Sequence, residues 1–535
     1  MFKNNDFYPY PSKRHVTYGK NGMVATSQQQ AADIGLDTLK KGGNAIDAAI
    51  AMAAALTILE PTRNGLGGDA FVLFWFQGKL YGLNASGKSP QAISIDKIKA
   101  KGHQTMPKFG AESITTPGQV GGWVALSEKF GALPFETVLA PVIKLAKTGF
   151  VVSSEVAKNW NTALKTYQKY LKKDILEAFE DTFSDHKKAP QNGELFHLPD
   201  HAQSLEAIAK TKGKAFYEGE LADQMIAFIE KQGGFLSKQD LKNYQPEFVD
   251  PIAINYKGYD VWELPPNGQG LITLEALKIY EPNKHDALNI NAIHQQIESL
   301  KLAFKDGLKF ISDPNHMPVS VKDFLQKDYI AKRRAQISDF AQDFKAGNPQ
   351  ASGTVYLASA DKDGNMVSFI QSNYMGFGSG VVIPKTGIAM QNRGHTFSLD
   401  EFDVNALKPN KRTYHTIIPG FITKDNQAVG PFGLMGGYMQ PQGHMQLIVN
   451  LIDEGLNPQA ALDKWRWQWL KEKNIVVEKY TPSAVIDGLV KKGHQVMIAP
   501  QETAFGVGQI ILRKPHNNVF VGGCDKRCDS AILGY

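Results

Sequence analysis

The chain has 535 residues, 42% of them hydrophobic, and a net charge of +6 that is spread along its length. No nucleic-acid-binding module surrounds its densest basic cluster, residues 167–173, so we expect no nucleic-acid partner. The first eight residues lack the apolar core of a signal peptide, and the longest apolar run, residues 45–59, contains Asp47 and is too short to cross a bilayer. The length suits two to four ordinary domains or one large α/β body.

The first half of the chain alternates helical and extended patterns. Residues 28–41 have helical spacing that ends at Gly42 and Gly43, and Asn44 can cap a second helix over residues 45–59. A glycine-rich turn then leads to strands over 70–76 and 79–84, whose short connection predicts a hairpin. From residue 124 to about 332 the pattern is mostly helical. After residue 354 strands dominate, with helices expected at 444–454 and at 458–469.

Cys524 and Cys528 are the only cysteines, which favours a reduced, cytoplasmic protein. Their spacing is compatible with a redox pair or half a metal site, but two free thiols in a glycine-rich loop is the simpler interpretation. The thirteen histidines show no ligand spacing, so we expect no metal and no other cofactor.

Residues 82–89 match the phosphate-binding pattern G-x-x-x-x-G-K-[ST], with Lys88 and Ser89 at its end. That loop binds phosphate because it opens a helix after a parallel strand. Here the preceding strand belongs to a hairpin, and Pro90 follows at once. A nucleotide-binding protein therefore stays a remote alternative.

Residues 345–352 have no apolar periodicity and resemble an exposed linker, and Gly353 and Thr354 then open a strand. A strand over 355–360, an Asp-Gly turn and a returning strand over 366–371 follow. If the chain were cut before Thr354, that residue would carry a nucleophilic hydroxyl and a basic α-amine together. An amine with a pKa near ~7.7–8.0 can act as a base at neutral pH. Taken alone, Thr354 is equally an ordinary β-branched residue that starts a strand.

A second glycine-rich segment spans residues 433–444, between an extended stretch and a helix. Gly436 and Gly437 are adjacent there, and neighbouring glycines let two backbone N–H groups point into one pocket, as an oxyanion hole requires. A tight strand-to-helix turn explains the glycines equally well.

Nine short motifs, taken together and in order, resemble the γ-glutamyltransferase family over residues 22–535. They lie at residues 22–25, 40–49, 60–61, 65–68, 353–354, 363–365, 377–380, 436–437 and 525–527. The resemblance implies a four-layer αββα fold of the N-terminal-nucleophile hydrolases, made as one inactive chain. It implies cleavage between Gly353 and Thr354 into a large subunit, 1–353, and a small subunit, 354–535, which remain one intertwined body. It leaves assembly beyond that pair open.

The resemblance also assigns roles. Thr354 is expected to be the nucleophile and Ser372 its hydrogen-bonding hydroxyl, while Gly436 and Gly437 form the oxyanion hole. The substrate pocket departs from the glutamyl-specific pattern: Ser86 stands where an arginine grips the α-carboxylate, and Tyr374 replaces an asparagine. Arg393 and Thr396 occupy positions where acidic residues hold the α-amine, and His415 and Thr416 replace a pair of serines.

Arg393 indicates which acyl group this chain binds in place of a glutamyl group: one with a carboxylate, since a guanidinium binds a carboxylate through two parallel hydrogen bonds. Residues 265–270 and 435–444 are similar to a divergent branch of the family that includes oxamate amidohydrolases. We therefore expect Arg393, Tyr374, His415 and Thr416 to bind a small carboxylate-bearing amide, which Thr354 cleaves through an acyl-enzyme. The alternatives are γ-glutamyl transfer or glutathione hydrolysis, a cephalosporin-acylase-like activity, and a binding protein that does not process itself.

Overall fold

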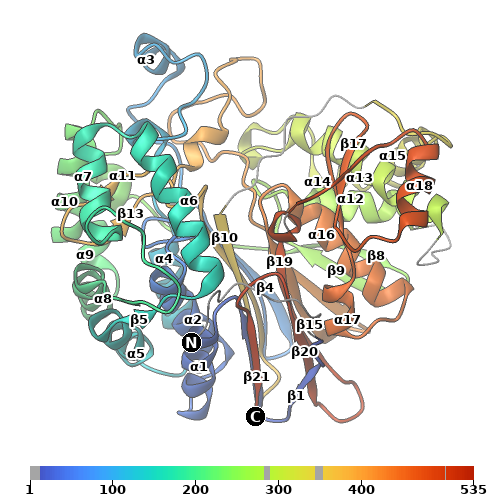
Figure 1. The fold of residues 1–535 in the computed structure, drawn as a ribbon, viewed down its shortest axis with the longest axis horizontal. Helices are drawn as coiled ribbons and strands as arrows, with labels where there is room; N and C mark the ends of the chain where they lie inside the picture. Colours follow the sequence, from blue (N-terminus) through green and yellow to red (C-terminus); the bar gives the residue numbers. More distant parts are fainter. Residues whose placement is uncertain (1–12, 282–288, 344–352, 501) are drawn as a thin grey trace.

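The computed structural model describes residues 13–281, 289–343, 353–500 and 502–535. Two seven-stranded sheets are stacked at the centre, and helices cover the outer face of each, so that the molecule has four layers, αββα, as expected (Figure 1). The expected linker, residues 345–352, and the first eight residues lie outside the described part of the chain.

The first sheet holds the strand that begins at Gly353. Its order is β21 (Ala531–Gly534), β2 (Gly22–Thr26), β10 (Gly353–Asp361), β11 (Met366–Tyr374), β3 (Asp69–Phe76), β4 (Lys79–Ala85) and β7 (Glu247–Val249). Both expected hairpins are present, as β3–β4 and β10–β11. Strand β10 lies between β2 and β11: its first residue, Gly353, pairs with β11, and β2 joins on the other side from Leu357 onward.

The second sheet runs in the order β1 (Thr17–Gly19), β20 (Phe520–Cys524), β19 (Val507–Arg513), β15 (Gln427–Met435), β14 (Gly420–Lys424), β9 (Tyr259–Glu263) and β8 (Ile252–Tyr256). Each sheet therefore mixes strands that precede residue 353 with strands that follow it. A chain cut at that point would keep its two parts hydrogen-bonded through both sheets.

Helices on the side of the first sheet are α1 (Gln29–Lys40), α2 (Ala45–Leu59), α4 (Gln119–Phe130), α5 (Phe135–Thr148), α6 (Ser154–Tyr170), α7 (Lys173–Phe183), α8 (Pro199–Thr211), α9 (Lys214–Tyr217), α10 (Glu220–Lys231) and α11 (Lys238–Lys242) (Figure 1). On the other side are α12 (Gly270–Tyr280), α13 (Ile290–Phe310), α14 (Val321–Phe324), α15 (Lys327–Arg334), α16 (Met439–Ile448), α17 (Pro458–Asp463) and α18 (Ser483–Lys491). Helix α3 (Ile95–Ala100) lies apart from both groups.

Small elements complete the chain. They are β5 (Phe150–Val151) with β6 (Leu195–Phe196), β12 (Val382–Ile383) with β13 (Ile388–Ala389), and a sheet of β16 (Trp467–Lys471), β17 (Asn474–Val477) and β18 (Gln495–Ile498). The 3₁₀ turns are η1 (Ala111–Ser113), η2 (Pro314–His316), η3 (Arg393–Thr396) and η5 (Glu502–Phe505), and the π-helical turn η4 (Val449–Asp453) extends α16.

Helix α2 is buried along its whole length, which explains why its sequence is apolar on every side. It begins at Asn44, whose side chain accepts from the amides of Ile46 and Asp47, while Asp47 accepts from the amide of Asn44 in return. The apolar run therefore belongs to the core of the first helical layer. No helix in the described ranges is long and apolar enough to cross a bilayer.

The helix expected over residues 458–469 is wrong in its second half. Helix α17 ends at Asp463, and residues 467–471 form the edge strand β16. Two glutamine side chains of α16 replace the missing neighbour strand: Gln446 exchanges hydrogen bonds with the backbone of Trp467, and Gln442 with that of Trp469. This pairing comes from a distant helix, so local propensity did not reveal it.

The loop that resembles a phosphate-binding loop does not open a helix, since the next helix, α3, starts at Ile95. The amide of Ser89 donates to the carbonyl of Lys411, and its hydroxyl donates to the carbonyl of Lys408. A Cβ on Gly87 would lie 1.6 Å from the carbonyl oxygen of Thr116. The loop packs against the protein itself, which removes the support for nucleotide binding.

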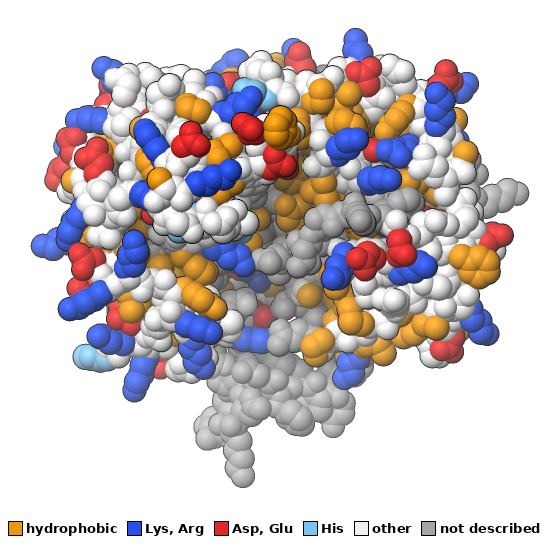
Figure 2. Space-filling model, turned by 90° about the horizontal axis from the view of Figure 1, so that it is seen from above, with side chains coloured by type: hydrophobic (Ala, Val, Ile, Leu, Met, Phe, Trp, Pro, Cys, Tyr) orange, Lys and Arg blue, Asp and Glu red, His pale blue; other side chains and the backbone are white. Residues whose placement is uncertain are grey.

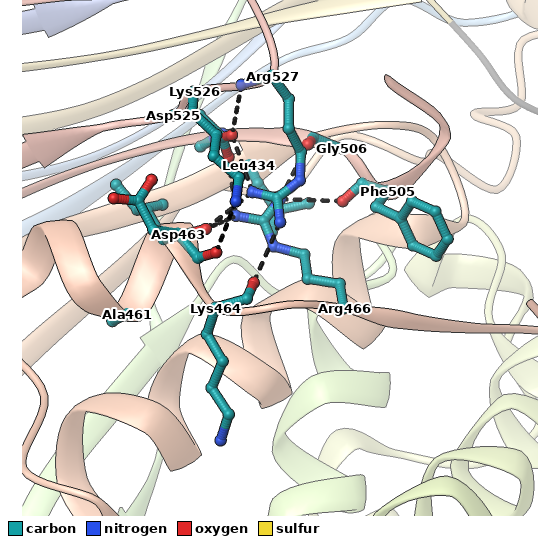
Figure 3. A network of polar contacts seen from close by, with 12 residues as sticks. Leu434, Ala461, Asp463, Lys464, Arg466, Phe505, Gly506, Asp525, Lys526 and Arg527 are labelled. Carbon is teal, nitrogen blue, oxygen red and sulfur yellow. Dashed lines mark hydrogen bonds and ion pairs between the residues drawn. The ribbon is translucent and has the colours of Figure 1, made fainter. Parts of the chain in front are cut away.

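The motif at residues 525–527 anchors the C-terminal part of the chain. Asp525 accepts from Arg466 at 2.7 Å and from Arg527 at 3.0 Å (Figure 3). Arg527 also pairs with Glu478. Burial alone would raise the pKa of Asp525, but the two guanidinium groups lower it to about 2. We call Arg466, Glu478, Asp525 and Arg527 the Asp525 network. It joins β20 to the segments around α17 and β17.

The face shown in Figure 2 carries interspersed positive and negative side chains and is hollowed near its middle. No single-sign patch of the kind that binds a nucleic-acid backbone is visible on that face.

Candidate active site

Thr354 lies at the start of the central strand β10 and is completely buried. Gly353 pairs with Tyr374 of β11, and regular pairing resumes at Val355 with Gln371, so a bulge falls at Thr354. Bulges of this kind redirect a side chain and are common beside active sites. The bulge places two residues of β11, Ser372 and Asn373, opposite the single residue Thr354, and the Thr354 hydroxyl faces Ser372.

Ser372 links the hydroxyl of Thr354 to the peptide bond that precedes it. The Thr354 hydroxyl donates to Ser372 Oγ at 3.2 Å, and Ser372 Oγ donates to the carbonyl oxygen of Gly353 at 2.6 Å. Ser372 Oγ also accepts from the amide of Tyr374 at 2.7 Å. One donated and two accepted bonds use the full capacity of a hydroxyl. The arrangement polarises the Gly353 carbonyl and positions the Thr354 oxygen next to it.

The position before Thr354 accepts only a glycine. A Cβ on Gly353 would lie 2.9 Å from the amide nitrogen of Gly376 and 3.1 Å from the Cα of Arg63. Both are backbone atoms of partly buried segments, so they cannot give way as the end of a flexible side chain could. The close approach brings residues 62–63, at the end of α2, directly against the Gly353–Thr354 bond.

Gly436 and Gly437 lie between β15 and α16, with φ of 134° and 60°. Side chains are strained at such angles, which explains the glycine pair. Their carbonyls accept from the amides of Met439 and Gln440. Among the described residues, neither glycine amide donates a hydrogen bond to another part of the chain. Two free amides at a strand-to-helix turn are what oxyanion binding requires. The assignment stays a prediction.

A cavity of about 520 Å³ opens beside this centre. Gly353 and Gly436 line it together with Met375 and Gly376. Helix α6 forms one wall, and residues 62–63 and 108–109 form others. The cavity gives a substrate access to the Gly353–Thr354 bond.

Arg393 is buried, with 1% of its surface exposed, so it is not a surface arginine. In the described part of the chain it also forms no ion pair. Its Nη1 donates to Thr416 Oγ1 at 2.8 Å, while Nε and Nη2 have no hydrogen-bond partner. Burial lowers its pKa to about 10, against the opposing field of Asp69. A buried guanidinium with two unused donors is costly unless an anion binds to it.

Tyr374 connects Arg393 to the hydroxyl pair of Thr354 and Ser372. Its φ of 75° is strained for an aromatic residue, and its amide is held by Ser372. The guanidinium carbon of Arg393 lies 4.3 Å from the centre of the Tyr374 ring, a cation–π distance. Tyr438, immediately after the glycine pair, hydrogen-bonds to Tyr374 and stacks on Tyr414. Arg393, Tyr374, Tyr438 and Tyr414 therefore form one continuous chain of contacts.

His415 contacts Asp69, with 3.1 Å between Nε2 and the carboxylate. Burial raises the pKa of Asp69 to about 7, although Arg393 opposes this, and lowers that of His415 well below its usual value. The pair is therefore a neutral imidazole that donates to a buried carboxyl group. Asp69 is the cross-strand neighbour of Ser372. The binding roles predicted for His415 and Thr416 stay predictions.

Sequence reasoning did not select Asp69, Tyr438 or Arg63. Asp69 directly follows the glycine-rich turn at 65–68, and Tyr438 directly follows the glycine pair, so their positions next to motifs were the available signal. Arg63 had no such signal, because only the contact between α2 and β10 brings it to Gly353.

One group of metal-ligand type forms away from this centre. His294, Glu298 and His494 offer ligand atoms within 4.8 Å of one another. However, the two imidazoles hydrogen-bond directly at 2.8 Å, and the ammonium of Lys301 lies 2.7 Å from Glu298. A buried ammonium already pairs with the carboxylate and the two imidazoles already bond to each other, so these residues fit a metal poorly. Histidines 200 positions apart could not be paired from sequence spacing.

The chain is similar to several known proteins over nearly its whole length. The family model described as Gamma-glutamyltranspeptidase matches residues 31–535. The glutathione hydrolase-like YwrD proenzyme of Bacillus subtilis is 35% identical, over 96% of this chain and 99% of the relative. The oxamate amidohydrolase proenzyme of Klebsiella pneumoniae is 31% identical, over 96% and 98%. The crystal structure of a cephalosporin acylase from Bacillus halodurans superposes with a TM-score of 0.97 at 52% identity, over 100% of this chain and 99% of that one.

Proposed function

This chain belongs to the γ-glutamyltranspeptidase family of amide-cleaving enzymes, and we propose that it is a self-cleaving amidohydrolase whose substrates carry a carboxylate on a short acyl group. The observation that carries the substrate proposal is Arg393, which is buried beside the nucleophile with two unpaired donors. The divergent relatives, an oxamate amidohydrolase and a cephalosporin acylase, are compatible with such a substrate.

Maturation begins when the Thr354 hydroxyl attacks the carbonyl carbon of Gly353. Ser372 donates to the carbonyl oxygen and accepts from the attacking hydroxyl, so it can pass the proton along this short chain. The C–N bond breaks, the threonine nitrogen takes up the proton, and an ester joins Gly353 to Thr354 Oγ. Water then hydrolyses the ester, which leaves a Gly353 carboxylate and a free Thr354 amine.

Turnover repeats the chemistry on an external amide. The Thr354 amine takes the proton of its own hydroxyl as the oxygen attacks the substrate carbonyl. The amides of Gly436 and Gly437 stabilise the oxyanion, and the amine product leaves with the proton. Arg393 holds the carboxylate of the acyl group through Nε and Nη2, while Tyr374 fixes the guanidinium plane. Water then hydrolyses the ester between the acyl group and Thr354, which releases the carboxylic acid product.

We expect Thr354→Ala to abolish both maturation and turnover, because no other described residue combines a hydroxyl with the new N-terminus. Intact mass of the purified wild type should give two fragments that sum to 58.9 kDa, the smaller one beginning at Thr354. The variant should give a single chain. Thr396→Ala, which removes a threonine hydroxyl elsewhere in the pocket, is the control and should still be cut. Activity retained by Thr354→Ala would contradict the mechanism.

A γ-glutamyl substrate is the second candidate, since glutathione hydrolases are also among the relatives. Asp69 supports it, because this buried acid next to Ser372 offers a group for an α-amine. Two rates of hydrolysis decide between these candidates: that of oxamate and short dicarboxylic monoamides, and that of a γ-glutamyl anilide. A preference for the γ-glutamyl anilide would overturn the carboxylate-only proposal.

A further inference from the structure

Gln269 is the last residue before helix α12 and is completely buried. It lies in segment 265–270, and no step of the proposed mechanism uses it. Its backbone amide donates to the carbonyl of His415 at 3.1 Å, and the amide of His415 donates to the carbonyl of Asn267 at 2.9 Å. These two backbone bonds fix Gln269 beside the segment that carries Thr416.

The side-chain amide of Gln269 joins two separate parts of the candidate site. Its Nε2 donates to the carbonyl oxygen of Thr416 at 2.6 Å and to that of Gly437 at 2.9 Å. Because carbonyl oxygens only accept, the nitrogen end of the amide must face both of them. Its Oε1 accepts from the hydroxyl of Tyr414 at 2.8 Å. All three bonds are buried, so water cannot replace them when one partner is removed.

The two carbonyls belong to residues with different expected roles. Thr416 accepts from Arg393 through its hydroxyl, so it lies on the side of the acyl group. Gly437 carries one of the two amides assigned to the oxyanion. A single nitrogen atom therefore sets the position of the oxyanion turn relative to the acyl pocket.

A second path of contacts closes a ring around the same turn. The ring of Tyr414 stacks on that of Tyr438, with 5.9 Å between their centres and 19° between their planes. Tyr438 directly follows Gly437, so the contacts run from Gln269 through Tyr414, Tyr438 and Gly437 back to Gln269. Gly437 has a φ of 60° and no side chain that limits its backbone. Its orientation consequently depends on the hydrogen bonds that its carbonyl accepts, from Gln269 and from the amide of Gln440.

From these contacts we infer that Gln269 is a positioning residue for turnover: it holds Gly437 so that the amide of this glycine faces the oxyanion, at a fixed place relative to Thr416. The inference rests on the proposed function, which gives the glycine pair its role. A preorganised donor stabilises the oxyanion because it needs no reorientation during the reaction.

Self-cleavage provides an internal control, because it does not use this turn in the same way. The carbonyl of Gly353 accepts from the hydroxyl of Ser372 at 2.6 Å. No hydrogen bond joins that carbonyl to Gly436 or Gly437 in the described part of the chain. Loss of Gln269 should therefore lower turnover and leave maturation intact.

Gln269→Glu tests the inference with a side chain of the same shape. The variant replaces the –NH2 group by an oxygen, so an ionised carboxylate repels both carbonyls and a protonated one donates to only one of them. We expect intact mass to show the same two fragments as in the wild type. The kcat for oxanilate, the anilide of oxalate, should fall at least about tenfold, since loss of a whole oxyanion donor costs about 10²–10³ in kcat. The KM should change less than the kcat.

Tyr414→Phe is the milder second variant, and it decides the question if Gln269→Glu is not cleaved. It removes the hydroxyl that holds Oε1 of Gln269 and keeps the ring that stacks on Tyr438. We expect its kcat to fall about two- to tenfold, the range for one neutral hydrogen bond.

Gln459→Glu is the matched control. Gln459 is 2% exposed, and its side chain bonds to the carbonyl and the amide of Cys524, away from the candidate site. This variant loses a similar buried amide, so it should be less stable but keep the kcat of the wild type. A fall in kcat for Gln269→Glu no larger than that for Gln459→Glu would overturn the inference.

The outcomes separate this inference from the proposed function. If the cleaved wild type hydrolyses oxanilate and both Gln269→Glu and Tyr414→Phe match its kcat, the inference alone is wrong. If the cleaved wild type hydrolyses only a γ-glutamyl anilide, the proposed substrate is wrong, and the same comparison is made with that anilide, because every amide needs the oxyanion site. An uncut wild type without activity would overturn both.

Discussion

Arg393 and Arg527 are both buried arginines, but their surroundings differ in one decisive respect. In the Asp525 network, Nε, Nη1 and Nη2 of Arg527 all donate hydrogen bonds, to Glu478, Asp525 and two backbone carbonyls. Arg393 donates through Nη1 alone, and its other two nitrogens are unpaired. Both side chains are equally removed from solvent, with 1% and 4% exposed.

The comparison separates a structural arginine from one that is prepared for a ligand. A buried charge that is fully hydrogen-bonded belongs to the fold, whereas one with unused donors costs free energy until an anion arrives. The neighbouring acids follow the same division. The pKa of Asp525 is lowered to about 2, although burial alone would raise it, whereas burial raises that of Asp69 to about 7.

The largest effect is expected from breaking the structural arginine. Arg527→Met leaves Asp525 and Glu478 without one of their cations, and removal of one partner of a buried pair costs about 3–5 kcal/mol. Urea denaturation should show this loss in the free energy of unfolding. Arg513→Met, which removes an arginine whose guanidinium hydrogen-bonds to Asn518 at an exposed position, should change it by less than about 0.5 kcal/mol. If Arg527→Met were as stable as the wild type, the distinction between a structural arginine and a ligand-binding one would fail.

Arg393→Met should show the opposite pattern. Because two of its donors are unpaired, the folded protein should lose little or no stability. The KM for a carboxylate-bearing amide should rise at least tenfold, matching the loss of a charged hydrogen bond of about 1.5–3 kcal/mol. Steady-state kinetics with oxanilate measures this, and Arg393→Lys should recover only part of it, since lysine lacks the planar fork. An unchanged KM with lowered stability would make Arg393 structural.

The last effect concerns pH. The folded pKa of Asp69 lies above the usual 3.8, so the native state holds more protons than the unfolded state between about pH 4 and pH 7. Its contribution to the free energy of unfolding therefore falls as pH rises through that window, by at most about 1.4 kcal/mol per pH unit. Asp525 has a lowered pKa, so its contribution is constant above pH 4 and is lost as pH falls toward 2.

Urea denaturation at pH 5 and pH 8 tests this difference. Asp69→Asn should gain stability relative to the wild type on going from pH 5 to pH 8, because the variant has no carboxylate to ionise. Asp525→Asn should be destabilised by the same amount at both values. Parallel behaviour of the two variants would show that Asp69 is ionised throughout this range.

Local sequence patterns determined much of the fold. The cap at Asn44, the apolar run of α2, and the two hairpins on either side of the glycine-rich and Asp-Gly turns lie close to where the patterns predicted them. These features depend on neighbours within a few residues. The strand at Trp467 pairs with β17 on one side, and on the other its partners are side chains of α16, more than 20 residues away in the sequence, which no local pattern indicates.

For the site, the sequence by itself determined which reactive groups are present: Gly353 and Thr354 at the start of a strand, a second hydroxyl at Ser372, and a glycine pair at 436–437. Only the tertiary structure decided how these groups are used. Three features depend on contacts between separate segments: the bulge of β11 opposite Thr354, the burial that leaves Arg393 with two unpaired donors, and the approach of Arg63 to Gly353. Burial and hydrogen-bond satisfaction are properties of the packed molecule, and no local pattern carries them.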